Sequence, residues 1–272
     1  GQPAAGENQA VTEKLSEVNI SYYVLDPTSN ITILAETPVP VELQPSVASR
    51  LMLAEPEAEQ AGFLSSEPGC DITLRMAGGE FCGNAAMSAA VVAATRKGEE
   101  SGTVTVRVSG APHPVTVKIK KQRDGSWLGT VNMPRPIGVR CMELPGFTRL
   151  PVVSFPGITH VIVEFPMEKG KAEALIREWC AFLGADALGI MILNRAESRL
   201  HPLVYVPSAG TLFWENSCAS GTTAVGSFLA AESGKTVEKT LQQPGGSLTI
   251  AASETGDLLL SGAVRIRKHA VF

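Results

Sequence analysis

Two segments with no charge in their interior constrain the fold of this chain more than any other feature. Residues 85–96 form a run rich in Ala, Met and Val that carries no charge until its end, and residues 219–231 form a second run of small and apolar residues. A helix that is apolar all round has to be buried. One cysteine precedes each run, Cys82 the first and Cys218 the second, half the length of the 272-residue chain apart. The chain therefore needs two cores, each built around one helix.

Strands surround both buried helices in the same order. We interpret this repeat as an α+β fold with two pseudo-symmetric domains, each a curved mixed sheet or barrel wrapped around a central helix. The active site is expected in the interdomain cleft. The predicted strands are 20–25, 31–35, 71–76, 104–108, 115–119, 127–133, 152–155, 160–165, 190–193, 203–206, 211–214, 247–251, 258–260 and 263–266, and two further helices are predicted at 45–53 and 171–183.

A cluster of prolines in residues 132–139 marks the predicted domain boundary. We expect an N-terminal domain at 15–131 that carries Cys82 and is completed by the C-terminal strand, about 263–272. The C-terminal domain is then 132–262 and carries Cys218. A cleft between two such domains would bring the two cysteines together.

Composition excludes several classes of function. A net charge of −4, with basic residues scattered along the chain, argues against a nucleic-acid surface and favours a small-molecule partner. Because the sequence has neither a signal-peptide pattern nor a membrane-length apolar run, we expect a cytoplasmic protein that does not bind membranes. Five widely spaced cysteines without a Cys-x-x-Cys pair, and four dispersed histidines, fit neither a disulfide framework nor a metal site.

The position of Cys82 and Cys218 suggests their chemistry. A thiol at a helix N-terminus feels the positive end of the peptide dipole, which should lower its pKa, and the free backbone N–H groups can hold a carboxylate. Two such sites facing each other would place a sulfur on each face of an amino acid's α-carbon. One thiolate would remove the α-proton while the other thiol delivers a proton to the opposite face. The backbone cradle for the ligand would come from Gly83, Asn84, Gly221 and Thr222.

Each of these residues also has a simpler interpretation. A single buried cysteine before a helix is more often an apolar filler, and only the matched pair favours catalysis. Glu215 could pair with the ligand or with a neighbouring loop. We expect His160 to be structural, and the remaining cysteines, which lack a glycine-flanked helix start, to be inert; these are Cys70, Cys141 and Cys180.

The two cysteine motifs resemble those of the diaminopimelate epimerase family, the amino-acid racemases that use two cysteines and no cofactor. The similar segments are Cys-Gly-Asn at 82–84, Cys-x-Ser-Gly-Thr at 218–222, the turn at 27–30, the glutamine-bearing segment at 59–63 and residues 131–134. The resemblance implies catalytic Cys82 and Cys218, no metal, no cofactor and a possible homodimer. The substrate-binding residues that it implies are Asn30, Glu59, Gln60, Gly83, Asn84, Ser220, Gly221 and Thr222.

The chain departs from true diaminopimelate epimerases where the far end of their substrate binds. Residues 205–214 lack the family's arginine, and residues 157–160 lack its asparagine. A site built for polar partners rejects a ligand that leaves them unpaired. The variant segments at 80–85, 205–207, 214–218 and 243–247 instead resemble the histidine racemase branch, which supplies D-histidine to opine-type metallophore synthesis. In that branch a glutamate beside the glutamine contacts the imidazole, and Glu59 occupies the matching position.

The resulting hypothesis is a racemase that converts L-histidine to D-histidine. A diaminopimelate epimerase or a broad-specificity amino-acid racemase is the first alternative. The second is a non-catalytic redox module in which Cys82 and Cys218 form a disulfide. A pyridoxal phosphate enzyme is less favoured, because no lysine sits at an apolar strand end or in a glycine-rich phosphate context.

Overall fold

The computed structural model describes residues 19–272, and its first half is a closed barrel. The strands follow one another around the barrel in chain order, and β16, the last strand of the chain, closes it by pairing with both β7 and β1. The expected start of the first domain at residue 15 and the N-terminal segment from residue 1 lie outside the described residues. The barrel strands are β1 (Ser21–Pro27), β2 (Thr32–Ala35), β3 (Gln60–Ser65), β4 (Ile72–Met76), β5 (Ser101–Val108), β6 (Val115–Lys121), β7 (Trp127–Asn132) and β16 (Leu258–Val271).

Helix α3 (Gly83–Lys97) packs against the barrel strands. It contacts β1, β2, β4, β5, β6, β7 and β16, and its residues from Gly83 to Ala94 are buried. Gly129 in β7 makes room for this packing, since a Cβ there would lie 3.0 Å from the sulfur of Met87. The helix ends at Gly98, whose φ of 68° is the left-handed conformation that glycine adopts without strain. The prediction of a buried helix at 85–96 is confirmed.

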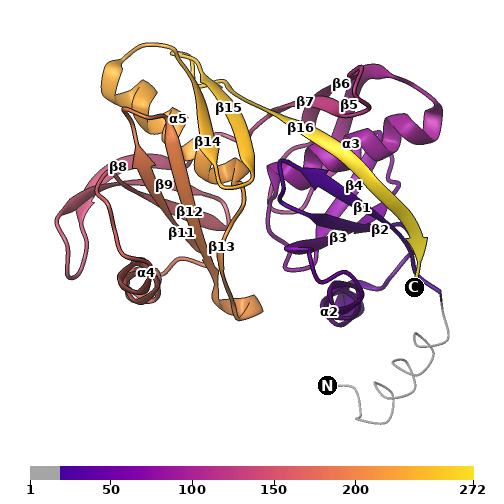
Figure 1. Cartoon of the computed structure of the whole chain (residues 1–272), viewed down its shortest axis with the longest axis horizontal. Helices are drawn as coiled ribbons and strands as arrows, with labels where there is room; N and C mark the ends of the chain where they lie inside the picture. The colour runs from indigo at the N-terminus through magenta and orange to yellow at the C-terminus, as the bar shows by residue number, and fades with distance from the viewer. Residues whose placement is uncertain (1–18) are drawn as a thin grey trace, which may run out of the picture.

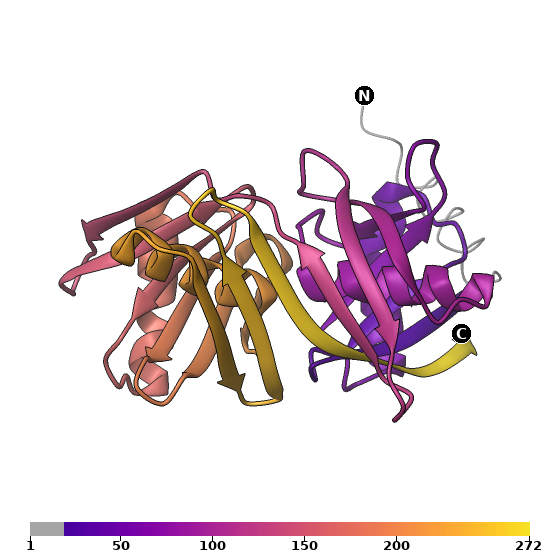
Figure 2. The same ribbon diagram turned by 90° about the horizontal axis from the view of Figure 1, so that it is seen from above.

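The second half continues the same sheet beyond β16. The order runs β16-β15-β14-β12-β11-β10-β9-β8, and β13 (Thr211–Trp214) pairs with β12 alone. Figure 1 shows the two halves side by side, and Figure 2 shows β16 running from one into the other. The remaining strands of this half are β8 (Gly138–Glu143), β9 (Arg149–Phe155), β10 (Ile158–Val163), β11 (Leu188–Asn194), β12 (Arg199–Val206), β14 (Val237–Gln243) and β15 (Gly246–Ala252).

The second buried helix, α5 (Ala219–Ser233), packs on this sheet and contacts α3. Helix α4 (Lys169–Leu183) packs against β11 and β12, and α2 (Gln44–Ala54) packs against β3 of the barrel. Short 3-10 turns, η1 (Val41–Leu43) and η2 (Pro207–Ala209), precede α2 and β13. Within residues 19–272 we find no helix with the length and apolar character needed to span a membrane.

The predicted helices are present and each predicted strand overlaps an observed one, but the two strands predicted at 258–260 and 263–266 are one continuous strand, β16, and three strands were not predicted. In β3, Gly62 interrupts the apolar alternation because its Cβ would lie 2.8 Å from the side chain of Leu74. Strand β8 is an exposed edge strand with little apolar pattern, and β14 is rich in charged and polar residues. Their pairing partners, rather than their own residue pattern, make these segments strands.

The turn between β1 and β2 holds two non-glycine residues in the left-handed region. Thr28 has a φ of 49° and Ser29 a φ of 62°, where Asn or Gly is normally found in a tight hairpin turn. A β-branched residue with positive φ is strained. We expect Thr28→Asn to raise the free energy of unfolding by about 1 kcal/mol in urea titration. Ser198→Asn, at a second left-handed residue with φ 54°, should stabilise less because serine is not β-branched. A destabilised Thr28→Asn protein would contradict this account of the turn.

Candidate active site

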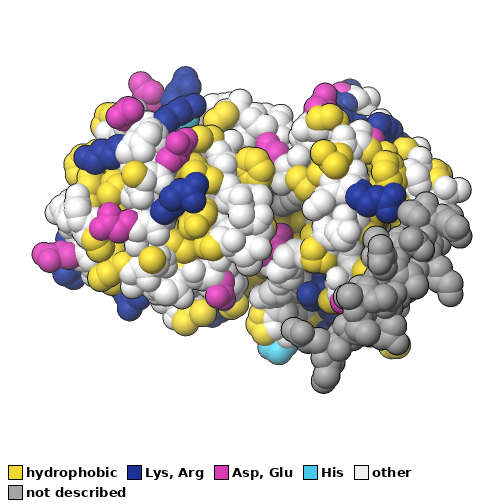
Figure 3. Space-filling model, turned by 90° about the horizontal axis from the view of Figure 1, so that it is seen from below, with side chains coloured by type: hydrophobic (Ala, Val, Ile, Leu, Met, Phe, Trp, Pro, Cys, Tyr) yellow, Lys and Arg dark blue, Asp and Glu magenta, His cyan; other side chains and the backbone are white. Residues whose placement is uncertain are grey.

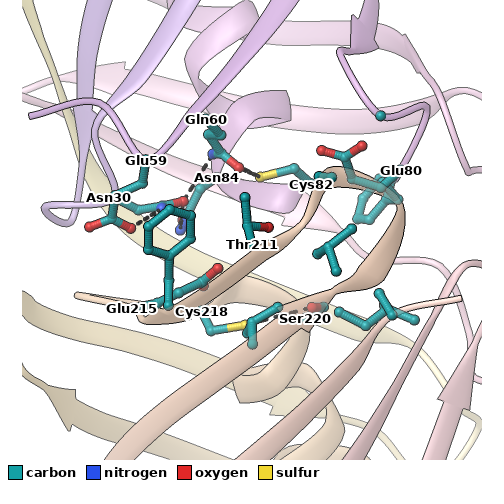
Figure 4. Close-up of a pocket in the computed structure, with 18 of the residues that line it drawn as sticks. Asn30, Glu59, Gln60, Glu80, Cys82, Asn84, Thr211, Glu215, Cys218 and Ser220 are labelled. Atoms are coloured by element: carbon teal, nitrogen blue, oxygen red, sulfur yellow. Dashed lines mark hydrogen bonds between the residues drawn. The ribbon is translucent and has the colours of Figure 1, made fainter. Parts of the chain in front are cut away.

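A cavity of about 190 Å³ lies between the two halves and is lined by residues from both. Figure 3 shows the surface hollowed between the halves, and Figure 4 shows Cys82 on one side of the cavity and Cys218 on the other. Eight of the sequence-predicted site residues line it, namely Asn30, Glu59, Gln60, Cys82, Gly83, Asn84, Cys218 and Ser220. The other two, Gly221 and Thr222, are buried behind Cys218 and are not among the lining residues.

Cys82 is the N-cap residue of α3. Its extended backbone (φ −139°, ψ 113°) turns the sulfur back over the helix start, where the backbone N–H of Ala85 donates to Sγ at 3.4 Å. The side-chain amide of Gln60 lies 3.1 Å from the same sulfur. The next residue, Gly83, leaves room for two neighbours, since a Cβ there would lie 2.9 Å from the sulfur of Met133 and 3.0 Å from the Cβ of Ala219. The first half thus presents one thiol at a helix N-terminus.

Cys218 is the N-cap residue of α5 and has the same geometry. The N–H of Gly221 donates to Sγ at 3.3 Å, and the hydroxyl of Ser220 lies 3.7 Å from it. Gly221 leaves room for the side chain of Met191, since a Cβ would lie 2.1 Å from its sulfur. Thr222 holds the segment by donating its hydroxyl to the carbonyl of Cys218 at 2.7 Å. Gln243 accepts the Cys218 N–H at 2.9 Å, which fixes the backbone from β14.

The pKa values of the two thiols run opposite to the sequence prediction. Burial raises the pKa of Cys82 to about 12, and this outweighs the lowering by the Ala85 N–H and by Gln60. Burial and the nearby carboxyl of Glu215 raise the pKa of Cys218 well above its usual value. The expectation that helix N-termini lower both pKa values was wrong, because desolvation is the larger effect here. Burial thus favours the thiol form of both cysteines.

Two amide side chains, Asn30 and Gln60, link Glu59 to Cys82, and Asn216 and Asn84 bond to the same network. Asn30 donates to one oxygen of Glu59 at 2.7 Å and Asn216 donates to the other at 2.6 Å. The oxygen of Asn30 in turn accepts from Gln60 at 2.9 Å and from Asn84 at 3.1 Å. Burial raises the pKa of Glu59, and the bonds from Asn30 and Asn216 oppose that rise. Asn216 was missed from sequence, although it lies two residues before Cys218 in one of the segments that carry the resemblance.

Two further carboxyl groups, Glu80 and Glu215, line the cavity. Burial raises the pKa of Glu80, and burial together with the charge of Glu59 raises the pKa of Glu215 to about 8. Among the lining residues of the described chain there is no Lys or Arg. The cavity is therefore lined by three carboxyl groups, and the charge of Arg75, which is not a lining residue, opposes the rise in the pKa of Glu80. Such a lining suits a ligand that brings positive charge or N–H donors.

The raised pKa of Glu215 predicts a pH dependence of stability. The folded protein holds this proton up to about pH 8, whereas the carboxyl of an unfolded chain releases it near 4.5. The stabilising contribution is thus complete below pH 4.5 and is lost as pH rises through 8. We expect the urea midpoint of the wild type to fall between pH 6 and about pH 9, and the midpoint of Glu215→Gln to fall less. The exposed control Glu238→Gln should behave like the wild type. If the midpoints of all three proteins fall equally with pH, the raised pKa of Glu215 is not the cause.

His160 contacts the Cys218 segment rather than only filling the core. Its Nε2 lies 2.8 Å from the hydroxyl of Ser220, and burial lowers its pKa to about 3, so the imidazole is neutral. Within the described chain Nδ1 has no hydrogen-bond partner. Gly189 makes room for the ring, since a Cβ at this residue would lie 2.1 Å from Nδ1. An unpaired acceptor at Nδ1 costs less than an unpaired N–H, so the favoured tautomer carries its proton on Nε2 and donates to Ser220. The serine hydroxyl can then donate toward Cys218.

The remaining cysteines lie outside the cavity lining. Cys141 is exposed on β8, Cys180 is buried in α4, and Cys70 is half-buried before β4. In the part of the chain that the structure describes, no three His, Cys, Asp or Glu side chains are grouped closely enough to hold a metal ion.

Comparisons with known proteins identify proteins of similar sequence. A family model described as the histidine racemase CntK N-terminal domain matches residues 19–269. A histidine racemase of Fusobacterium nucleatum is 28% identical over 259 residues, which covers 91% of this chain and 94% of that protein. A histidine racemase of Staphylococcus aureus is 29% identical over 255 residues, covering 88% and 90%.

Solved structures share the fold at low identity. A predicted epimerase from Pseudomonas aeruginosa has a TM-score of 0.71 at 13% identity, covering 93% of this chain and 99% of its own. A hydroxyproline epimerase from Agrobacterium vitis, solved with trans-4-hydroxy-L-proline, has a TM-score of 0.66 at 11% identity, covering 94% and 92%. A Bacillus anthracis protein of the phenazine biosynthesis PhzF family scores 0.67 at 15% identity, covering 94% and 99%.

Proposed function

The chain belongs to the histidine racemase CntK family and is an isomerase, and from this premise we propose that it converts L-histidine to D-histidine. Cys82 and Cys218 are the two acid–base groups, and no cofactor takes part. The family that matches is the histidine racemase family, and the comparisons do not reach the diaminopimelate epimerase family that the cysteine motifs resemble. The relationship to the diaminopimelate epimerase family and the two-base mechanism are both part of the proposal.

The proposed reaction removes the α-proton from one face of the α-carbon and adds a proton to the opposite face. One cysteine, as thiolate, takes the α-proton and becomes a thiol, while the other thiol gives its proton to the opposite face and becomes a thiolate. Because burial raises both thiol pKa values, one of the two cysteines has to give its proton to solvent before it can act as the base. The substrate's ammonium group supplies the positive charge that favours a thiolate beside it. Backbone N–H groups at the starts of α3 and α5 stabilise the negative charge that develops on the substrate.

The acidic lining of the cavity is the single observation that carries the choice of histidine. Histidine brings an ammonium and an imidazole N–H, which match Glu59, Glu80 and Glu215. Diaminopimelate brings a second carboxylate, which would face these groups without an arginine. Glu59 is the proposed imidazole acceptor, because Asn30 and Asn216 occupy only part of its acceptor capacity. Asn30, Gln60, Asn84, Ser220, Gly221, Thr222 and Gly83 complete the proposed binding residues.

We further assign two pseudo-symmetric domains, each with a sheet around one central helix. The N-terminal domain is 15–131, of which residues 15–18 lie outside the described part, completed by the C-terminal strand at about 263–272. The C-terminal domain is 132–262. Pairing of β16 with β1 and β7, and the positions of α3 and α5, support this division. The cavity between the halves is then the interdomain active site.

Isotope exchange in heavy water tests the function. With L-histidine as the substrate we expect deuterium at the α-carbon together with formation of D-histidine, and with LL-diaminopimelate neither. Exchange into diaminopimelate alone would overturn the histidine assignment. Absence of exchange into any common L-amino acid, with both cysteines reduced, would favour the redox module instead. An absorbance spectrum with cofactor bands would contradict the cofactor-free mechanism.

A further inference from the structure

Three segments from both halves of the molecule meet beside the cavity at unusually short range. They are the strained turn at 27–30, residues 214–217 before α5, and residues 244–246 between β14 and β15. Gly245 donates its N–H to the carbonyl of Asn216 at 2.8 Å and accepts the hydroxyl of Ser29 at 2.9 Å. A Cβ on Gly245 would lie 2.4 Å from that of Ser29 and 2.8 Å from that of Asn216. Only glycine permits this approach.

Asn216 makes the most direct connection across this junction. Its Nδ2 donates to the carbonyl of Ser29 at 3.1 Å and to Oε1 of Glu59 at 2.6 Å. Both acceptors belong to the barrel half, while Asn216 lies two residues before Cys218. A second link runs in the other direction, from Asn84 to the hydroxyl of Ser217 at 3.4 Å. The carboxylate in the barrel is thus held by the segment that carries the second thiol.

The position of Asn216 limits how Glu59 can receive a ligand. An ionised carboxylate accepts at about four lone-pair sites, and Asn30 and Asn216 occupy one on each oxygen. Glu59 lines the cavity, and Figure 4 shows its carboxylate beside Asn30. Without Asn216 the carboxylate would lose one of its two anchors and could turn toward solvent. Its remaining lone pairs would then no longer be aimed at a ligand.

We propose that Asn216 is a positioning and specificity-determining residue, which aims Glu59 at an N–H donor in the substrate's side chain and ties that recognition to the docking of the Cys218 segment. The specificity role of Asn216 rests on the proposed function, because it needs histidine as the substrate. The docking role of Asn216 does not depend on the substrate. A ligand side chain with an N–H donor, such as an imidazole, can bond to the acceptor sites of Glu59 that Asn30 and Asn216 leave free. A side chain that carries a carboxylate is rejected by the same group.

Alkylation of the cysteines tests the docking role without any substrate. Wild type, Asn216→Ala and the matched control Asn194→Ala, which removes an exposed asparagine at the end of β11, are treated with iodoacetamide, and each cysteine is followed by mass spectrometry. Loss of a hydrogen bond to a charged group should speed alkylation of Cys82 and Cys218 by about tenfold in Asn216→Ala. The control should match the wild type. Equal rates in all three proteins, at equal thermal midpoints, would overturn the docking role.

A double-mutant cycle tests the specificity role. In heavy-water exchange, Asn216→Ala should raise KM for L-histidine by about tenfold with a smaller effect on kcat. In a Glu59→Ala background the same substitution should have little further effect on KM, because the residue that it positions is gone. Additive effects would overturn the positioning role. If the wild type exchanges another amino acid instead of histidine, the proposed function has failed, and the cycle run with that amino acid still decides the role of Asn216.

Discussion

Cys82→Ser and Cys218→Ser should each lower the rate of racemisation by about a thousandfold or more, the usual loss when a general acid or base is removed. A serine hydroxyl is too weak an acid and base to replace a thiol in this exchange. The two variants should nevertheless differ from each other. In each one, the remaining thiolate can still take the α-proton from the enantiomer that presents it and return a deuteron to the same face. Exchange then occurs without inversion.

The two single variants are therefore expected to exchange opposite enantiomers. The measurement is α-deuteration of L-histidine and of D-histidine in heavy water, followed by chiral separation. Cys141→Ser, which alters an exposed thiol outside the cavity, should leave both reactions unchanged. Full racemisation by both active-site variants would refute the two-base mechanism. Exchange of the same enantiomer by both would contradict the placement of one sulfur on each face.

Glu59→Gln should raise KM for L-histidine by about a hundredfold, although glutamine has the same shape. In the native site Asn30 and Asn216 each donate to one oxygen of the carboxylate. A glutamine can accept on one side only, and its NH2 group would face the NH2 group of an asparagine. The variant loses a charge-assisted bond and gains a buried, unpaired donor, each of which costs about 1–3 kcal/mol.

Steady-state kinetics of histidine exchange separate this effect from a general loss of fold. The rise should lie in KM more than in kcat, because Glu59 is proposed to contact the substrate's side chain and not the α-carbon. Glu57→Gln is the matched control, since Glu57 is an exposed carboxylate two residues away that pairs with Arg267. Unchanged KM for Glu59→Gln would remove the basis for assigning the imidazole to this residue.

Local patterns predicted the parts of this molecule that depend on neighbours in sequence. The helices that follow Cys82 and Cys218 were evident because no charge interrupts them, and an N-cap position follows from where a helix begins. Eight of the ten expected site residues line one cavity, but Glu59 and Gln60 lie at the start of the unpredicted strand β3 and were expected only from the family resemblance. The residues that were missed act across the chain: Asn216 reaches Glu59, and His160 reaches Ser220.

The thiol pKa values show a different limit of sequence reasoning. A helix N-terminus is a local property, and its lowering influence on Cys82 is present as the Ala85 N–H. The opposing influence is burial, together with carboxyl groups contributed by Glu80 and by Glu215 from the other half. Desolvation depends on what covers the sulfur, which only the assembled fold decides. The sign of a pKa shift in such a site cannot be taken from the motif.

The closure of the barrel through β16 has a consequence for how the chain is made. Ser21, near the start of the described chain, pairs with Val271, one residue from its end. On a ribosome, β1 and β7 emerge long before their common partner, so both strands keep open edges until residues 258–271 have been made. Such distant pairings fold slowly and leave edges that can aggregate. The barrel half, although translated first, should be the last to reach its native state, and premature termination near residue 258 would leave it without the strand that closes it.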